Sequence, residues 1–155
     1  MAMDMVSVIM PVYNSGRFIE DSILSVISQT YSCWELIVVD DGSTDNSKDI
    51  VEQYVKKDSR IHLLQNYKPL GIPAIPRNIG IQQAKGRFIA FLDSDDWIKD
   101  ESLSLLYDEA VKHHADVVMG NMWLCHQDGS MDKPFKCISN GSIKELLSGK
   151  ESFIE

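Results

Sequence analysis

The fold of this chain is indicated by one apolar run, Val6-Ser7-Val8-Ile9-Met10-Pro11-Val12. It is apolar at nearly every position, as a strand must be when helices cover both faces of a parallel sheet. Similar β-rich runs farther along the chain predict strands at 35–39, 61–64, 87–92 and 117–119. Amphipathic stretches separate these runs. The alternation predicts an α/β fold, a three-layer α/β/α sandwich around a mostly parallel sheet with right-handed crossovers.

The helices between the strands follow from apolar residues at helical spacing. The first is expected to be capped by Asn14 or Ser15, and the second by Ser43 or Thr44. A proline-punctuated loop over 69–76 should precede a short helix over 77–84. A further helix is expected around 103–110, a hairpin turn at 128–129 and a short helix at 142–147.

Composition excludes several classes of protein. With 155 residues and 44% hydrophobic side chains, the chain is expected to be one soluble domain. No window is apolar enough for a membrane span, and the first residues do not resemble a signal peptide. The net charge of -8 argues against nucleic acid as a partner. The three cysteines indicate free thiols in the cytoplasm, with a Cys125–Cys137 disulfide as the alternative.

Polar clusters directly follow three of the predicted strands, where open α/β sheets bind their ligands. They are Pro11-Val12-Tyr13-Asn14, Asp40-Asp41-Gly42-Ser43-Thr44-Asp45 and Asp93-Ser94-Asp95-Asp96. Three aspartates within four residues repel one another unless a positive charge is close. Their oxygens suit Mg²⁺ or Mn²⁺, and Arg77 is an available basic partner.

These clusters occur in one order along the chain together with three further motifs. The three are Ser28-Gln29-Thr30-Tyr31, the strand Trp34-Glu35-Leu36-Ile37-Val38-Val39 and Arg77-Asn78-Ile79-Gly80. In that order the sequence resembles the family 2 glycosyltransferases from Val6 to about Ala115. The resemblance implies a GT-A, Rossmann-like fold. It also implies transfer of a sugar from a nucleotide-diphosphate sugar, most often a UDP-sugar, to a saccharide or glycolipid acceptor, with inversion and a divalent metal.

The resemblance assigns nucleotide-binding roles by position. Pro11, Val12 and Tyr13 match residues that line the nucleotide pocket, with the tyrosine ring near the base. Asp41 matches the acid that hydrogen-bonds the pyrimidine edge, while Asp40 is expected to point elsewhere or brace the turn. Arg77 matches a basic residue near the nucleotide.

The acidic cluster after the fourth strand matches the family's DxD signature. The resemblance implies that Asp93 approaches the ribose and joins Asp95 as a metal ligand, with Asp95 holding the Mn²⁺ or Mg²⁺ that bridges the diphosphate. Ser94, between them, belongs to the nucleotide-binding set. Asp96 is a neighbour of that metal.

No residue of this chain can be matched to the family's catalytic base. We therefore interpret residues 1–155 as a single glycosyltransferase domain without the acceptor-binding part, and the alternative is a non-catalytic nucleotide-sugar-binding module. A phosphoacceptor domain would carry its acidic pair after the first strand, whereas here the pair follows the second strand, which argues against that class. A dinucleotide dehydrogenase would have GxGxxG where Pro11-Val12-Tyr13-Asn14 stands. We expect a cytoplasmic location that allows peripheral association with the membrane's inner face.

Overall fold

The computed structural model describes residues 4–67, 71–72, 74–126 and 130–132. The chain forms two compact units, Met1–Glu101 and Ser102–Glu155. Among the described residues, no helix has the length and apolar character needed to cross a bilayer.

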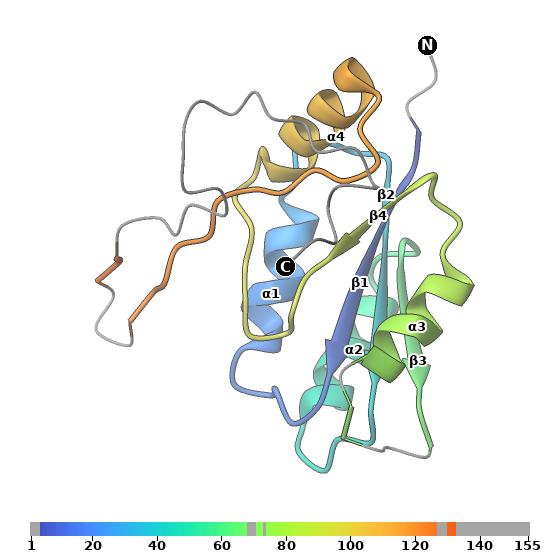
Figure 1. The fold of residues 1–155 in the computed structure, drawn as a ribbon. Coiled ribbons are helices and arrows are strands. Elements are labelled where there is room, and N and C mark those ends of the chain that lie inside the picture. The colour runs from blue at the N-terminus through green and yellow to red at the C-terminus, as the bar shows by residue number, and fades with distance from the viewer. Residues whose placement is uncertain (1–3, 68–70, 73, 127–129, 133–155) are drawn as a thin grey trace. The chain divides into compact units, whose positions relative to one another are not determined.

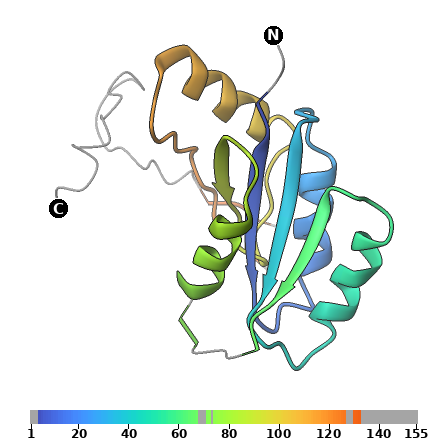
Figure 2. The same ribbon diagram turned by 90° about the vertical axis from the view of Figure 1, so that its right-hand side faces the viewer.

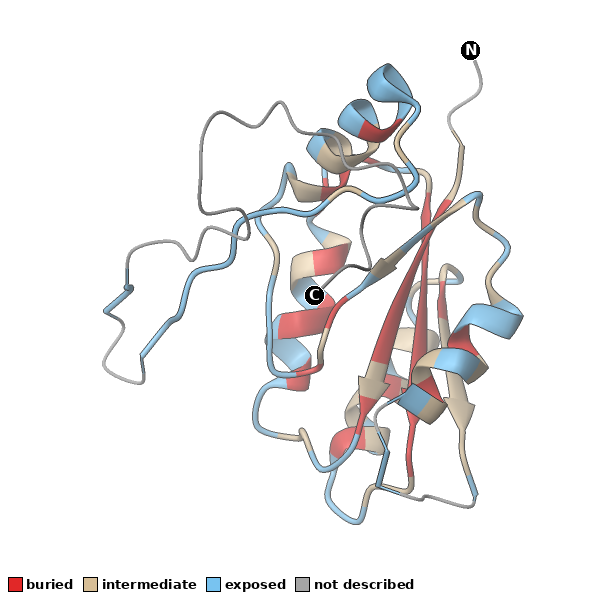
Figure 3. Cartoon of the chain, viewed as in Figure 1, coloured by how far each residue is buried: buried red, intermediate tan, exposed pale blue. Residues whose placement is uncertain are grey.

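A four-stranded parallel sheet forms the centre of the first unit. Its strands are β1 (Val6–Val12), β2 (Trp34–Asp40), β3 (Ile61–Gln65) and β4 (Phe88–Phe91), arranged in the order β3-β2-β1-β4. The two central strands are buried almost throughout (Figure 3). The four strands expected in this unit are therefore confirmed, because only strands covered on both faces need such continuous apolar runs.

Helices cover both faces of the sheet, which confirms the three-layer α/β/α sandwich. α1 (Ile19–Ile27) and α2 (Ser47–Val55) lie on one face and α3 (Ala74–Gln83) lies on the other (Figures 1 and 2). The chain runs outward from β1 to β3 and then returns past β1 to form β4. This reversal creates a switch point at the carboxyl ends of β1 and β4, the usual place for a ligand in an open α/β sheet.

Pro11 explains why β4 is shorter than expected. The backbone N–H of Leu92 donates to Ile9 O (3.1 Å), and the next bond of a parallel ladder would come from the N–H of residue 11. Proline has no N–H, so the ladder stops there. The chain after Leu92 is thereby free to turn away from β1 at the switch point.

The helix starts differ from the expected ones. α1 begins after Phe18 and α2 after Asn46, and neither N-cap residue makes a side-chain capping bond. Asn14 and Ser43 instead form hydrogen bonds between the loops that follow β1 and β2. α3 begins at Ala74 rather than near 77, because Pro76 falls in its first turn, where a missing N–H costs no helical hydrogen bond.

The second unit contains α4 (Ser102–His113) and an isolated antiparallel bridge between Cys125 and Met131. The described residues form no strand at 117–119, so that expectation is wrong. The bridge flanks the expected hairpin turn, whose residues 128–129 lie outside the described part, as do Cys137 and 142–147. Neither Cys33 nor Cys125 forms a disulfide with another described residue, and the alternative Cys125–Cys137 pairing falls outside them.

Candidate functional site

The carboxyl ends of the strands surround a depression of about 300 Å³ at the switch point. All eight residues proposed from the sequence line it, although they come from four separate segments. They are Pro11, Val12, Tyr13, Asp41, Arg77, Asp93, Ser94 and Asp95. Of the other described residues, Ser15, Gly71 and Pro76 also line it.

The ends of β1 and β2 are held in register beside this depression. Val12 pairs with Asp40, and the backbone N–H of Asp41 donates to Val12 O (2.8 Å). Asp40 accepts a bond from Ser43 N (3.1 Å), so it braces the turn as expected. Asp41 is the residue of this pair that lines the depression.

Asp41 is oriented by a residue that sequence reasoning missed. Only 4% of Asp41 is exposed, and Asn66 Nδ2 donates to its Oδ1 at 2.5 Å. Asn66 follows β3, so nothing in the local sequence connects it with Asp41. The bond occupies one carboxylate oxygen and leaves the second one free of this donor.

Tyr13 stands at the mouth of the depression with 59% of its surface exposed. A ring that merely filled the core would be covered, so packing does not explain this tyrosine. An exposed ring at this position offers an apolar face to a planar group.

Among the described residues that line the depression, Arg77 of α3 is the one cation. Its Nη2 lies 2.5 Å from Asp93 Oδ1, and both side chains are partly exposed. The guanidinium has further N–H groups, so it can hold Asp93 and still donate to an anion.

Negative charge accumulates in the turn that follows β4. Asp96 N donates to Asp93 O (3.1 Å), which closes the turn around Ser94 and Asp95. The pKa of Asp96 is raised, first because its carboxyl is partly desolvated and then because Asp95 and Asp93 are negatively charged nearby. A cation at this turn would relieve that repulsion.

The carboxylates fit a divalent ion that is shared with a ligand. Asp95 is exposed and Asp93 is partly exposed, and both offer the hard oxygens that Mg²⁺ and Mn²⁺ prefer. The described residues contain no group of three or more His, Cys, Asp or Glu side chains placed to hold a metal by themselves. The remaining ligands would have to be water or phosphate oxygens, which is the usual situation for Mg²⁺.

The loops after β1 and β2 are joined by a dense set of hydrogen bonds beside the depression. Asn14, in a left-handed conformation (φ 52°), accepts from Thr44 N (2.8 Å) and donates its own N–H to Ser43 Oγ (3.0 Å). Gly16 N donates to Asp45 Oδ2 (2.8 Å). Asn14, Ser43 and Thr44 therefore join the two loops beside the depression rather than cap helices.

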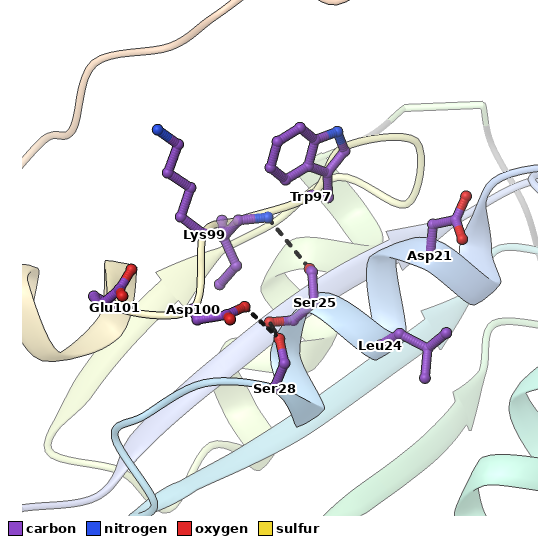
Figure 4. A pocket seen from close by; sticks show the side chains of 9 residues that line it. Asp21, Leu24, Ser25, Ser28, Trp97, Lys99, Asp100 and Glu101 are labelled. Atoms are coloured by element: carbon purple, nitrogen blue, oxygen red, sulfur yellow. Dashed lines mark hydrogen bonds between the residues drawn. The ribbon is translucent and has the colours of Figure 1, made fainter. Parts of the chain in front are cut away.

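A second, larger depression of about 650 Å³ lies between α1 and residues 97–101 (Figure 4). None of the eight predicted residues lines it. Ser25 and Ser28 point from α1 toward this segment, and Trp97 stands at the rim with 48% of its surface exposed. The eight residues predicted from the sequence therefore line the smaller depression and not the larger one.

The comparison with protein families gives one consistent answer. Residues 7–150 match the profile of Glycosyl transferase family 2. The chain is 40% identical over 151 residues to a glycosyltransferase of Haemophilus influenzae, covering 97% of this chain and 60% of that protein. It is 42% identical over 149 residues to the Escherichia coli UDP-Glc:alpha-D-GlcNAc-diphosphoundecaprenol beta-1,3-glucosyltransferase WfgD, covering 94% of this chain and 57% of that protein.

Solved structures have the same fold. TarS 1–349 of S. aureus, in complex with UDP, superposes with a TM-score of 0.67 at 39% identity, over 72% of this chain and 33% of TarS 1–349. The mannosyltransferase PcManGT of Pyrobaculum calidifontis, in complex with GDP-Man and Mn²⁺, superposes with a TM-score of 0.61 at 28% identity, over 75% of this chain and 34% of that one. This chain thus spans a third to three-fifths of the length of these proteins.

Proposed function

The chain belongs to glycosyl transferase family 2, and from this membership we propose that it binds a nucleotide-diphosphate sugar for transfer to a saccharide or glycolipid acceptor. The expected setting is the biosynthesis of a polysaccharide or glycoconjugate. The observation that carries the proposal is the gathering of eight predicted residues around one depression. Four segments distant in sequence meet there, at the switch point of the sheet.

The proposed roles follow from the chemistry of each group. Tyr13 would pack near the base, and Asp41, held by Asn66, would accept a hydrogen bond from the base edge. Arg77 would donate charge-assisted bonds to the diphosphate while keeping Asp93 in place.

Asp95 and Asp93 would hold Mn²⁺ or Mg²⁺ together with the diphosphate. A divalent ion bound there offsets the negative charge that the diphosphate gains as it leaves the sugar. The contribution of the protein would be to hold Asp93 against Arg77 and to carry Asp95 two residues farther along the same turn. Asp93 would also approach the ribose.

A UDP-sugar is the proposed donor. TarS has been solved with UDP, and the name of the E. coli relative specifies UDP-Glc. PcManGT was solved with GDP-Man and Mn²⁺. The affinities of this chain for UDP and for GDP must therefore be compared directly.

We also propose an inverting displacement and a location in the cytoplasm at the inner face of a membrane. The E. coli relative is named for a diphosphoundecaprenol-linked substrate, which is a lipid. No general base has been identified among residues 1–155. Because the chain spans only 57–60% of the two bacterial relatives, binding of the donor without transfer is the second candidate function.

Calorimetric titration of the purified chain tests the proposal. UDP and GDP are each titrated with Mn²⁺ and with EDTA, using wild type, Asp95→Ala and the control Asp49→Ala. Asp49 is an exposed aspartate on α2 that does not line the depression. We expect UDP to bind more tightly with Mn²⁺, Asp95→Ala to lose this gain and Asp49→Ala to keep it. Preference for GDP would contradict the UDP assignment, and no binding of either nucleotide by folded protein would contradict the function.

Transfer is tested separately with UDP-sugars and a polyprenyl-diphosphate saccharide. Formation of product by this chain would support catalysis. Metal-dependent binding of UDP without product, together with activity of a chain as long as the relatives, would favour the binding module for residues 1–155.

A further inference from the structure

The turn that carries Asp95 is held by a buried serine of α1. Ser22 is 1% exposed, and its Oγ lies 2.6 Å from the carbonyl oxygen of Asp96 and 2.9 Å from that of Ser94. These two carbonyl groups lie on either side of Asp95 in the chain. One hydroxyl group therefore fastens the backbone both before and after Asp95.

Asp95 depends on its backbone for its position. Its side chain makes no hydrogen bond or ion pair with the residues that the structure describes, and it is exposed. Its neighbour Asp93 is held by Arg77. The direction of the Asp95 carboxylate is consequently set by the turn beneath it.

Serine is well suited to this contact. Its hydroxyl hydrogen can be shared between the two carbonyl oxygens, which is a three-centre bond. Alanine would leave both oxygens facing a methyl group, one of them in a buried and one in a partly buried place, where unsatisfied acceptors are unfavourable. The turn would then shift or loosen in order to reach other donors.

Ser25 of α1 and Ser28, the residue that caps the carboxyl end of α1, bind the same segment farther along. Ser25 Oγ accepts from Ile98 N (3.2 Å), and Ser28 Oγ donates to Asp100 Oδ1 (2.9 Å) (Figure 4). The spacing of three residues keeps Ser22 and Ser25 near one face of α1. Ser28 thus makes a similar type of bond to the segment, but five residues beyond Asp95.

We propose that Ser22 is a positioning residue for the divalent cation. By fastening the carbonyl groups of Ser94 and Asp96, it fixes the direction of the Asp95 carboxylate and so sets how strongly a metal increases the affinity for a nucleoside diphosphate. This inference rests on the proposed function of the site. Ser22 itself lies beneath the turn and does not line the depression.

The test compares Ser22→Ala with Ser28→Ala in the full chain. UDP is titrated by calorimetry with saturating Mn²⁺ and with EDTA, and the metal gain is the ratio of the two dissociation constants. We expect Ser22→Ala to lower this gain by about 10- to 100-fold, the effect typical of residues that orient metal ligands. The affinity in EDTA should stay within about twofold of wild type for both variants, and Ser28→Ala should keep the full gain.

Three results would overturn the inference. Ser22→Ala with an undiminished metal gain would show that the turn does not need the hydroxyl. An equal loss in Mn²⁺ and in EDTA would indicate general damage to the depression. A wild-type chain without any metal gain would overturn the proposed function as well, which distinguishes that failure from the first two.

Ser22→Cys keeps the inference testable if Ser22→Ala does not fold, as judged by circular dichroism. A thiol keeps a polar hydrogen at this position, but its sulfur is larger than oxygen and it is a weaker donor than a hydroxyl. The metal gain of Ser22→Cys should therefore fall below that of wild type with the affinity in EDTA unchanged. A metal gain equal to that of wild type would contradict the role of the hydroxyl.

Discussion

Asp45 shows how a single side chain connects the two loops that border the depression. Its Oδ1 accepts from the backbone N–H and the hydroxyl of Ser47, and its Oδ2 accepts from Gly16 N. These bonds favour the carboxylate and hold the pKa of Asp45 below the ordinary value of 3.8, with the Ser47 hydroxyl as the largest cause. A Cβ at Gly16 would lie 2.0 Å from Asn46 Oδ1 and 2.9 Å from Asp45 Oδ2, so these two side chains would have to move.

This lowered pKa predicts a pH-dependent contribution to stability. The stabilisation is fully present above the ordinary carboxyl pKa and is lost as the pH falls through the lower pKa of the folded protein. We expect Asp45→Asn to have a lower Tm than wild type at pH 7, because its amide group places a donor against donors. The difference should narrow as the pH approaches about 3. Thermal melts across this range measure it, and a difference independent of pH would contradict the role of the charge.

The strands of the first unit are also joined at their amino-terminal ends, far from the depression. Ser7 Oγ donates to the buried Glu35 Oε1 (2.6 Å) and accepts from Gly86 N (2.8 Å), while Lys85 N donates to the same Glu35 oxygen (2.7 Å). β1, β2 and the turn before β4 therefore meet at one polar cluster. A Cβ at Gly86 would lie 2.6 Å from both Met5 O and Ser7 N, so the turn requires glycine.

Removing the hydroxyl at the centre of this cluster should destabilise the sheet. Ser7→Ala leaves the Glu35 carboxylate and the Gly86 N–H each without one partner in a buried place, which typically costs about 1–3 kcal/mol. Urea denaturation measures this loss of unfolding free energy. Ser32→Ala, at an exposed serine between α1 and β2, is the control and should stay within about 0.5 kcal/mol of wild type. Equal stability of the two variants would show that the cluster does not hold the sheet.

The net charge of the whole chain bears on how it binds an anion. The chain carries 15 basic and 23 acidic side chains, and the described residues that line the depression include three aspartates and one arginine. Without a metal, both the local and the overall charge repel a nucleoside diphosphate. Salt largely screens such repulsion between charges that are farther apart than a Debye length, which is about 10 Å at 0.1 M.

Metal-free binding of UDP should therefore strengthen with salt. Raising NaCl from about 20 to about 200 mM should increase the affinity for UDP in EDTA by a factor of about two or more, since the screened charges are mostly repulsive. Calorimetry or fluorescence titration measures it, with uridine as the uncharged control whose affinity should not change. Weakening of UDP binding by salt would instead show that attraction to Arg77 outweighs the aspartates.

Much of the fold and of the candidate site could be predicted before the structure. The strands of the first unit follow from continuous apolar runs such as Val6–Val12, because burial on both faces demands apolar residues at successive positions. The eight site residues directly follow strands or match family positions, so their convergence could be expected. The residues at which the helices start could not be predicted. Asn14 and Ser43 are good capping residues, but each forms hydrogen bonds with the neighbouring loop instead.

The sequence by itself thus determined the α/β class, the family resemblance and the residues that gather at the switch point. Only the tertiary structure decided that Asn66 orients Asp41, that Pro11 ends the ladder with β4, and that Ser22 fastens the turn around Asp95. The physical reason is the range of the interactions. Periodicity and strand ends are local properties of the chain, whereas a hydrogen bond across 25 or 72 residues depends on where folding places its donor and acceptor.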